Sequence, residues 1–583
     1  MSSSGPPPPY APEPALRHAT WLVLAAGVLL FAVRLAGPAD LTDNDQEGPT
    51  AYVLDILQNG HWWVQRDAHG EIASKPPLYP WLAALAALAA GGLTRFTLYL
   101  PCALAVVGTA LLMLRAGARS FGVTAGLLAA WSLLFSSFGL KHVVLARTDA
   151  VFMATVTLAA LAAHRAWTTG RGEIGFWLAA GAASLTKGPL GLGLAAGGWL
   201  AAWWEGRGQE PCPLRLRLWP GVALYAVLFG GWFALAYAEV GAALTEKQVG
   251  RELLGHLSGA SAGGHWPGAK PFHPLLYFLS RFAPWSLLAC LGCWRVWRRP
   301  APRLAERRFE RFLVCWLAVG MVVFTVASHK RADLLLPLLP AAGLLAGREL
   351  AGLLAKVRPV RIWQGAGVVG LVVLATAPLL TRLKAESGEV MPQTRAMRQL
   401  ALWWRTQAPP GLPLTFAGNA MTLEFYLQRH QFHVSPALAA RLLSGEAAGF
   451  VAVADFAALE ALRPPGQVWH ELARAPVEGE PFIRLLSNRS SLSREETMAV
   501  AVGPVLVRLT DATLVTANWL DFTLATSAGG AGGVVTLQNS APRAVTVGVR
   551  WQGGQSRLVQ RRTLQPGESW EVRQRDADSV WLR

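Results

Sequence analysis

Long apolar runs occupy most of the first 380 residues of this 583-residue chain. They are about as long as a membrane-spanning helix, roughly 17 to 25 residues with a few shorter, and lie near 21–36, 97–114, 120–140, 150–167, 174–186, 189–204, 218–238, 274–294, 311–327, 333–347 and 362–380. Only 15% of the residues are charged and 52% are hydrophobic, whereas a soluble globular chain carries about 25% charge. The pattern therefore predicts a polytopic α-helical membrane protein with about 11 to 13 spans.

The net charge of +17 predicts a topology rather than an anionic partner. Because the positive charge coexists with long uncharged runs, nucleic-acid binding is disfavoured. We expect the 14-residue apolar segment 79–92 to lie on the outer surface without spanning, since this places every strongly basic loop in the cytoplasm. The cytoplasmic parts would then be a Pro-rich tail at 1–20 and the basic segments 115–119, 164–171, 215–217, 295–311 and 348–361.

The same topology divides the rest of the chain into domains. A transmembrane domain is expected at 21–381, with long outer loops at 38–78 and 240–273. Residues 382–495 mix helix-like and strand-like stretches and predict an extracytoplasmic α/β domain. In residues 496–583, apolar and polar side chains alternate with a period of two between Gly-rich turns, which predicts an extracytoplasmic β-sandwich.

The first outer loop carries a cluster of acids and a lysine. Asp43, Asp45 and Glu47 follow the first span closely, and Lys75 precedes two prolines. A solvated acidic surface is one interpretation. The aromatic and Pro-rich composition of the loop suits the bilayer interface instead, which favours a rigid active site at the level of the lipid headgroups.

Further ionisable residues are expected at the outer ends of later spans. They are Arg147 and Asp149 in LARTDA, Lys187 in LTKGP, and Lys330 and Arg331 in SHKRAD. Charged residues at such depth are costly and are candidates for function, although a lysine can also reach the interface by snorkelling. Cations suit a lipid phosphate leaving group and a carboxylate suits a base for an acceptor hydroxyl. We predict no metal site and find no P-loop, HExxH or GxSxG motif, so nucleotide binding and metalloprotease or serine hydrolase activity are unsupported.

At these motifs the chain resembles the polyprenyl-phosphate-sugar-dependent membrane glycosyltransferases of the GT-C type, the group that contains the lipid A aminoarabinose transferases and the protein O-mannosyltransferases. The matching segments are, in order, TDNDQEGPTAYVLDILQNGHW, SKPPLYPW, LARTDA, LTKGP, RFAPWS and SHKRADLLLPLLP. The resemblance implies a GT-C-like fold with a long first outer loop and a C-terminal domain that varies among members. It also implies an inverting transfer of a sugar from a polyprenyl-phosphate donor.

The resemblance assigns roles to individual residues. The first-loop aspartate of the family matches Asp45, as general base or acceptor-orienting group, and the second family acid matches Asp149. Phosphate contacts are implied at Lys75, at Arg331 and, by a weaker match, at Arg251.

Two departures from the family pattern leave alternatives open. Gln46 follows Asp45 where members often carry Glu, so Asp43 or Glu47 are alternative bases. Ser74 replaces an acid of the aminoarabinose enzymes, which argues against a metal contact at this point and weakens lipid A as the acceptor. A divalent cation elsewhere stays open as a cofactor.

The expected function is thus sugar transfer to a lipid A, glycolipid or protein acceptor on the outer face of a bacterial cytoplasmic membrane. The expected partners are the lipid-linked donor, the acceptor and membrane lipids, with the N-terminus in the cytoplasm. A transporter or lipid flippase, with Lys187 contacting the cargo, is the alternative. A membrane scaffold is a third, more distant interpretation.

Overall fold

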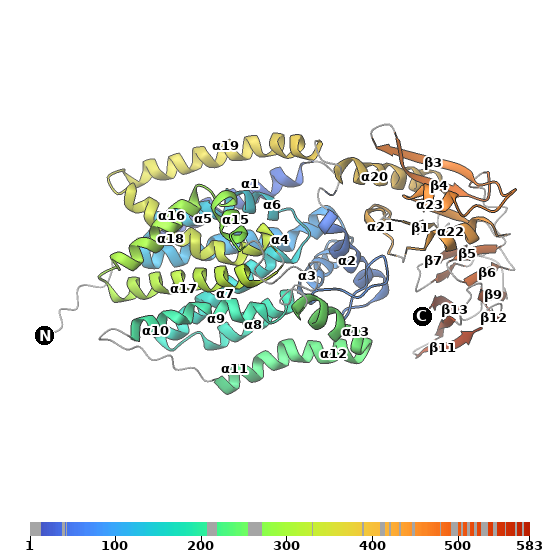
Figure 1. Cartoon of the computed structure of the whole chain (residues 1–583), viewed down its shortest axis with the longest axis horizontal. Helices are drawn as coiled ribbons and strands as arrows, with labels where there is room; N and C mark the ends of the chain where they lie inside the picture. The colour runs from blue at the N-terminus through green and yellow to red at the C-terminus, as the bar shows by residue number, and fades with distance from the viewer. Residues whose placement is uncertain are drawn as a thin grey trace. The chain divides into compact units, whose positions relative to one another are not determined.

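The computed structural model of the chain describes most residues from 13 onward. The described residues are 13–37, 41, 44–206, 218–254, 271–328, 330–386, 390–408, 414–418, 421–430, 433–445, 449–477, 480–490, 492, 499–502, 505–509, 514–517, 522–525, 534–539, 545–553, 556–565, 568–573 and 577–582. They fold as two units (Figure 1). The first comprises Met1–Pro38, Trp62–Val64 and Ile72–Leu383, and the second Ala39–His61, Gln65–Glu71 and Lys384–Arg583.

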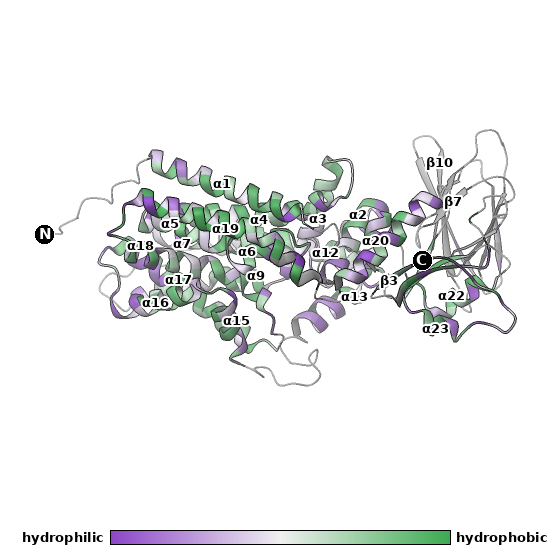
Figure 2. Cartoon of the chain, turned by 90° about the horizontal axis from the view of Figure 1, so that it is seen from above, coloured by the Kyte–Doolittle hydropathy of each residue, from purple (hydrophilic) through white to green (hydrophobic). Residues whose placement is uncertain are grey.

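The first unit is a bundle of helices, many of which are long and apolar enough to cross a membrane. Seven such helices occur among the described residues, at Pro14–Leu35, Arg95–Phe121, Thr148–Thr169, Trp219–Val240, Leu304–Val326, Ala332–Leu353 and Pro359–Leu379. An eighth is added if α15 (His273–Arg281) and α16 (Trp285–Arg298), bent by 115°, form one broken span. The helices α1 (Glu13–Leu35) and α19 (Pro359–Glu386) leave large apolar side chains exposed, as suits a helix that faces lipid. Figure 2 shows hydrophobic residues along the helices of this unit.

The span count of about 11 to 13 is not confirmed, because several predicted spans form shorter helices. The run at 120–140 gives α5 (Val123–Leu134) and α6 (Ser137–His142), and the run at 189–204 is divided among α9 (Leu190–Ala196), η2 (Gly197–Trp199) and α10 (Leu200–Gly206). The run at 174–186 lies in α8 (Glu173–Lys187), which ends at Gly188. Gly188 has φ +74°, a conformation that glycine adopts at little cost. Hydropathy located these apolar runs but not the points at which their helices break.

The segment 79–92 forms α3 (Leu78–Ala89). Twelve residues of helix are about 18 Å long, well short of the roughly 30 Å hydrocarbon core of a bilayer. The length of α3 thus agrees with a segment that does not span. Its place on the outer surface stays a prediction.

Close helix packing forms the centre of the first unit. Helices α4 (Arg95–Phe121), α5, α7 (Thr148–Thr169), α17 (Leu304–Val326) and α18 (Leu339–Leu353) pack against one another (Figure 1). A Cβ atom at Gly126 of α5 would lie 2.4 Å from the carbonyl oxygen of Leu114 on α4. Only glycine permits this approach, as in other membrane helix pairs.

The second unit begins with part of the segment predicted as the first outer loop, namely η1 (Asn44–Gln46) and α2 (Glu47–Asn59). Its α/β part has a four-stranded sheet in the order β1-β2-β4-β3, built from β1 (Thr415–Ala417), β2 (Phe450–Val453), β4 (Glu480–Ser487) and β3 (His470–Val477). Strands β1 and β2 are parallel and the other pairs are antiparallel, with Val451 opposite Leu486.

Helices cover both faces of this sheet, and successive side chains of its strands point into two different hydrophobic cores. Phe450, Ala452 and Leu485 pack with α20 (Val390–Gln407) on one face. On the other face, Val451 and Leu486 pack with α22 (Pro436–Leu443) and α23 (Phe456–Glu460). Successive strand residues point to opposite faces, so both faces of the strands are apolar.

The C-terminal strands form two further antiparallel sheets. One has the order β11-β10-β13-β8-β7 and the other β12-β9-β6-β5. Their strands are β5 (Ala499–Val502), β6 (Val505–Leu509), β7 (Leu514–Ala517), β8 (Phe522–Ala525), β9 (Val534–Asn539), β10 (Val545–Gly553), β11 (Ser556–Leu564), β12 (Ser569–Arg573) and β13 (Ala577–Leu582). The antiparallel strands agree with the period-two pattern, whereas packing of the two sheets as a sandwich stays a prediction.

Candidate functional site

An ion-pair cluster in the first unit contains four of the predicted site residues, and two of them, Arg147 and Lys187, both pair with Asp149. Asp149 lies in the first turn of α7 and its side chain is 2% exposed. Its Oδ1 lies 2.5 Å from Lys187 Nζ, and its Oδ2 lies 3.1 Å from Arg147 Nε. Lys187 is the last residue of α8 and Arg147 directly precedes α7, so helix ends bring both cations to one carboxylate. A carboxylate at a helix N-terminus also interacts favourably with the helix dipole.

Arg147 links this carboxylate to a second one. Its Nη1 lies 3.0 Å from Asp333 Oδ2, in η6 (Ala332–Leu338), and Lys141 Nζ lies 2.9 Å from the same oxygen. His142 Nε2 lies 3.6 Å from Asp333 Oδ1. The Arg147 guanidinium thereby joins the motifs LARTDA and SHKRAD, and the pair of Lys187 with Asp149 joins LTKGP to them.

Lys75 is near the same cluster. It pairs with Glu252 of η4 (Thr245–Leu254), in the segment predicted as the second outer loop, and Gln248 of η4 donates to the Ala73 carbonyl at 3.1 Å. Burial lowers the pKa of Lys75 from its ordinary value, opposed by Glu252, and Lys187 and Asp149 are close enough to act on it electrostatically. The cluster therefore combines four cations (Lys75, Lys141, Arg147 and Lys187) with three carboxylates (Asp149, Asp333 and Glu252).

The remaining predicted cations have other contacts. Lys330 Nζ donates to the carbonyls of Phe324, Thr325 and Ala327 at the end of α17, where a cation satisfies carbonyls that lack helical partners. Arg251 forms an exposed ion pair with Glu246 at 2.9 Å. Arg331 directly precedes η6 in an extended conformation.

The first-loop acids belong to the second unit, whereas Asp149 and the cations belong to the first. Asp45 lies in η1 and is partly exposed. Glu47 starts α2, is 7% exposed and accepts a hydrogen bond from Thr422. Burial raises the pKa of Glu47 above its ordinary value, and the Thr422 hydrogen bond only partly opposes this. Asp43 lies outside the described residues.

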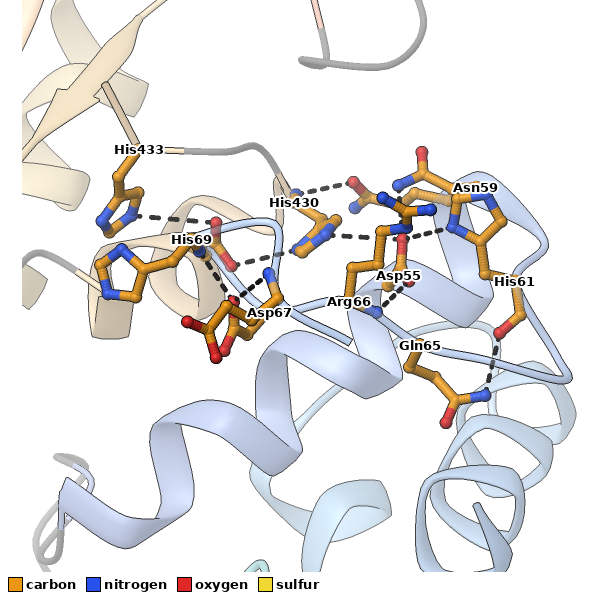
Figure 3. A network of polar contacts seen from close by, with 12 residues as sticks. Asp55, Asn59, His61, Gln65, Arg66, Asp67, His69, His430 and His433 are labelled. Carbon is orange, nitrogen blue, oxygen red and sulfur yellow. Dashed lines mark hydrogen bonds and ion pairs between the residues drawn. The ribbon is translucent and has the colours of Figure 1, made fainter. Parts of the chain in front are cut away.

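A buried carboxylate that no sequence motif predicted lies in the same segment (Figure 3). Asp55 of α2 is inaccessible to solvent, and its oxygens accept hydrogen bonds from Asn59 Nδ2 and the Arg66 backbone N–H, both at 2.7 Å. His61 Nδ1 lies 3.0 Å from Asp55 Oδ1. Burial raises the pKa of Asp55, but His61, His430 and Asn59 outweigh burial, so that the pKa lies below its usual value.

A histidine from the C-terminal part completes this network. His430 Nε2 lies 3.5 Å from Asp55 Oδ1 and its Nδ1 lies 3.2 Å from Glu424 Oε2. One sequence signal was present, because Asp55 interrupts the otherwise apolar stretch from Tyr52 to Leu57. No local pattern links that position to residues 424–430.

The described residues contain no group of three or more His, Cys, Asp or Glu side chains arranged to hold a metal ion.

Comparisons with known proteins agree with the motifs. The family model of dolichyl-phosphate-mannose-protein mannosyltransferases matches residues 74–213, which include Lys75, Arg147, Asp149 and Lys187. No curated protein sequence matches the chain.

The fold is similar to solved membrane-enzyme structures. ArnT from Cupriavidus metallidurans bound to undecaprenyl phosphate matches with a TM-score of 0.62 and 17% identity, over 81% of this chain and 99% of that chain. Its apo state gives the same score and identity over 82% and 99%. The oligosaccharyltransferase AglB from Archaeoglobus fulgidus matches with a TM-score of 0.46 and 10% identity, over 95% and 94%. The family match and the ArnT fold thus confirm that this chain resembles the membrane glycosyltransferases of the GT-C type.

Proposed function

We propose that this chain is an inverting glycosyltransferase that moves a sugar from a polyprenyl-phosphate carrier to a cell-envelope acceptor. The observation that carries the proposal is the ion-pair cluster of the first unit, in which Arg147 connects Asp149 and Asp333 and in which cations outnumber carboxylates. The cluster lies mostly within the segment that matches the mannosyltransferase family.

The cluster suits a phosphate leaving group for electrostatic reasons. Charge-assisted hydrogen bonds from Lys and Arg to phosphate are among the strongest available. Cations paired with carboxylates are held in place before the ligand arrives, so they need little rearrangement when charge develops on the departing phosphate. Lys75, Lys187 and Arg147 are the proposed phosphate contacts, and Lys141 extends the set through Asp333. Lys330, Arg331 and Arg251 stay as further candidates.

Asp45 is the proposed base. Among the first-loop acids it is partly exposed, whereas Glu47 is buried against Thr422 with a raised pKa. A partly exposed carboxylate is better suited than Glu47 to accept a proton from an arriving hydroxyl. Asp43 and Glu47 are the alternatives, and Asp149, already held by two cations, is the proposed organiser of the phosphate contacts.

In the proposed reaction, the acceptor oxygen attacks the anomeric carbon of the sugar on the face opposite the phosphate. The new carbon–oxygen bond forms as the bond between that carbon and the phosphate oxygen breaks. Asp45 takes the proton of the acceptor, and the bonding electrons leave with the polyprenyl phosphate. The sugar is transferred with inversion.

The donor class is supported by the similar structure of ArnT, which was solved with undecaprenyl phosphate. The acceptor class extends over lipid A, glycolipids and proteins. The proposed location is the outer face of a bacterial cytoplasmic membrane, with the N-terminus in the cytoplasm and the C-terminal domain outside. The family match favours a glycosyltransferase over the alternative of a transporter or lipid flippase.

The test uses purified chain in liposomes with a labelled sugar on undecaprenyl phosphate and a cell-envelope acceptor extract. Asp45→Asn is expected to abolish transfer, since the amide cannot take the proton. Asp455→Asn is the matched control, because Asp455 caps α23 and asparagine caps a helix equally well. Full activity of Asp45→Asn would remove Asp45 from the reaction.

A further inference from the structure

Contacts within the second unit hold both sides of the proposed base. Before Asp45, the Leu41 backbone N–H donates to Tyr426 Oη at 3.1 Å, and Thr394 Oγ1 donates to the Leu41 carbonyl at 3.0 Å. After it, Thr422 Oγ1 donates to the Glu47 carboxylate. The partners belong to α20 and to α21 (Met421–Leu427). Segments more than 350 residues apart in sequence thus fix the short stretch that carries Asp45.

The far end of α2 is fixed in the same way. Gln58 Nε2 donates to the Gln428 carbonyl at 2.7 Å, and the His430 backbone N–H donates to Gln58 Oε1 at 2.9 Å. This reciprocal pair aligns α2 with the turn that follows α21.

His430 connects two buried carboxylates (Figure 3). Asp55 and Glu424 are 0% and 1% exposed, and His430 is 1% exposed. An imidazolium can donate from both ring nitrogens, one toward each carboxylate. A neutral imidazole can donate to only one of them, which would leave the other buried carboxylate poorly compensated.

Several titratable groups lie around His430. Its neighbours are Asp55, Glu424 and Asp67, together with His61 on Asp55 and His433 on Glu424. Burial and His69 lower the pKa of His433 to about 3, and its Nδ1–H donates to the Gly418 carbonyl at 3.0 Å. The approach of His433 Nε2 to Glu424 Oε1 at 3.9 Å is therefore not an ion pair.

Burial alone would lower the pKa of His430, but Glu424 and Asp55 outweigh burial, so the pKa lies above its ordinary value. The His430 contribution to stability is thus fully present below about pH 6.5 and is lost as the pH rises through the raised value.

We propose that the C-terminal part of the second unit is a working part of the transferase, in which Thr422, Tyr426 and His430 are positioning residues that hold the acidic segment 44–58 in its reactive conformation. The inference rests on the proposed function and deepens it. These side chains act on the reaction through α2 and η1, and no contact with a substrate is assigned to them.

The experiment compares Thr422→Val and His430→Gln with matched controls. Thr406→Val is the control for threonine, because Thr406 lies exposed on α20 and donates to the Trp403 carbonyl of its own helix. His470→Gln is the control for histidine, on the partly exposed strand β3. Sugar transfer from undecaprenyl phosphate is measured in liposomes across the titration range of histidine.

Both test variants are expected to lower kcat by about 10-fold or more with little change in the donor KM. A misplaced catalytic group slows the chemical step but does not weaken the binding of the donor. The wild type should lose activity on the alkaline side as His430 loses its proton, and His430→Gln should lack that pH step. Wild-type kcat and pH profile in both variants would overturn the inference.

Hydrogen–deuterium exchange of the α2 amides gives a readout that needs no activity. Faster exchange at residues 47–58 in both test variants, and in neither control, is expected. Unchanged exchange overturns the inference, as does faster exchange with wild-type kcat. If the wild type transfers sugar and both test variants are equally active, the inference is refuted and the proposed function stands. If the wild type transfers no sugar, the proposed function is refuted, and the exchange data alone then decide whether the C-terminal contacts hold the acidic segment.

Discussion

Replacing Lys187 by methionine should lower both the stability of the first unit and its activity. Lys187 Nζ lies 2.5 Å from Asp149 Oδ1, and the Asp149 side chain is 2% exposed. Removing one partner of a buried pair costs about 3–5 kcal/mol because the other charge stays buried without compensation. Arg147 still contacts Asp149 Oδ2 at 3.1 Å, so we expect the lower end, about 3 kcal/mol.

The double variant Lys187→Met/Asp149→Asn separates the two effects. Neutralising Asp149 removes the uncompensated charge, so about 2 kcal/mol of the lost stability should return. Sugar transfer should not return, because the phosphate contact is still missing. Lys356→Met, at an exposed lysine after α18, is the control and should change stability by less than about 0.5 kcal/mol.

The assay is equilibrium unfolding in mixed detergent micelles, with sugar transfer measured on the same preparations. A double variant that is no more stable than Lys187→Met would refute the reasoning, since Asp149 would then not be the source of the cost. Recovery of transfer in the double variant would equally contradict a role for Lys187 at the phosphate.

Two further predictions concern Arg147 and Asp55. Arg147→Lys should lower kcat at least about 10-fold, because Nε and Nη1 of one guanidinium contact Asp149 and Asp333 while a single ammonium cannot reproduce this geometry; wild-type kinetics would contradict the bridging role. Asp55→Asn should lower the free energy of unfolding of the second unit by about 3 kcal/mol at neutral pH, given its buried charge-assisted hydrogen bonds. Since the pKa of Asp55 is lowered in the folded chain, its contribution is present above about pH 4 and is lost as the pH falls through the lowered value. Acid titration of unfolding should therefore show a smaller loss of stability for Asp55→Asn than for the wild type.

Three residues of the ion-pair cluster lie in motifs that the sequence had singled out. Arg147, Asp149 and Lys187 were expected at the outer ends of neighbouring spans, and the structure joins them in one ion-pair cluster. The prediction worked because each residue lies at a helix end, where the chain leaves an apolar run. Glu252 and Lys141 were not candidates, since neither stands out in its local sequence.

Local sequence patterns could not predict where the helices break or which distant segments contact each other. Apolar runs give no sign of the 115° bend between α15 and α16. The pairing of Glu47 with Thr422 spans 375 residues and depends on the packing of α2 against α21. For the same reason the sequence predicted a mixed α/β region after residue 382, but not that residues 39–61 would fold with it.

Polyprenyl phosphate is the proposed leaving group of the sugar transfer. The most direct measurement quantifies undecaprenyl phosphate released and sugar incorporated into the acceptor by the purified wild-type chain, together with the anomeric configuration of the product. The account predicts equal amounts of both and an inverted anomeric centre. Movement of the lipid-linked sugar across the membrane without release of undecaprenyl phosphate, or a retained configuration, would contradict it.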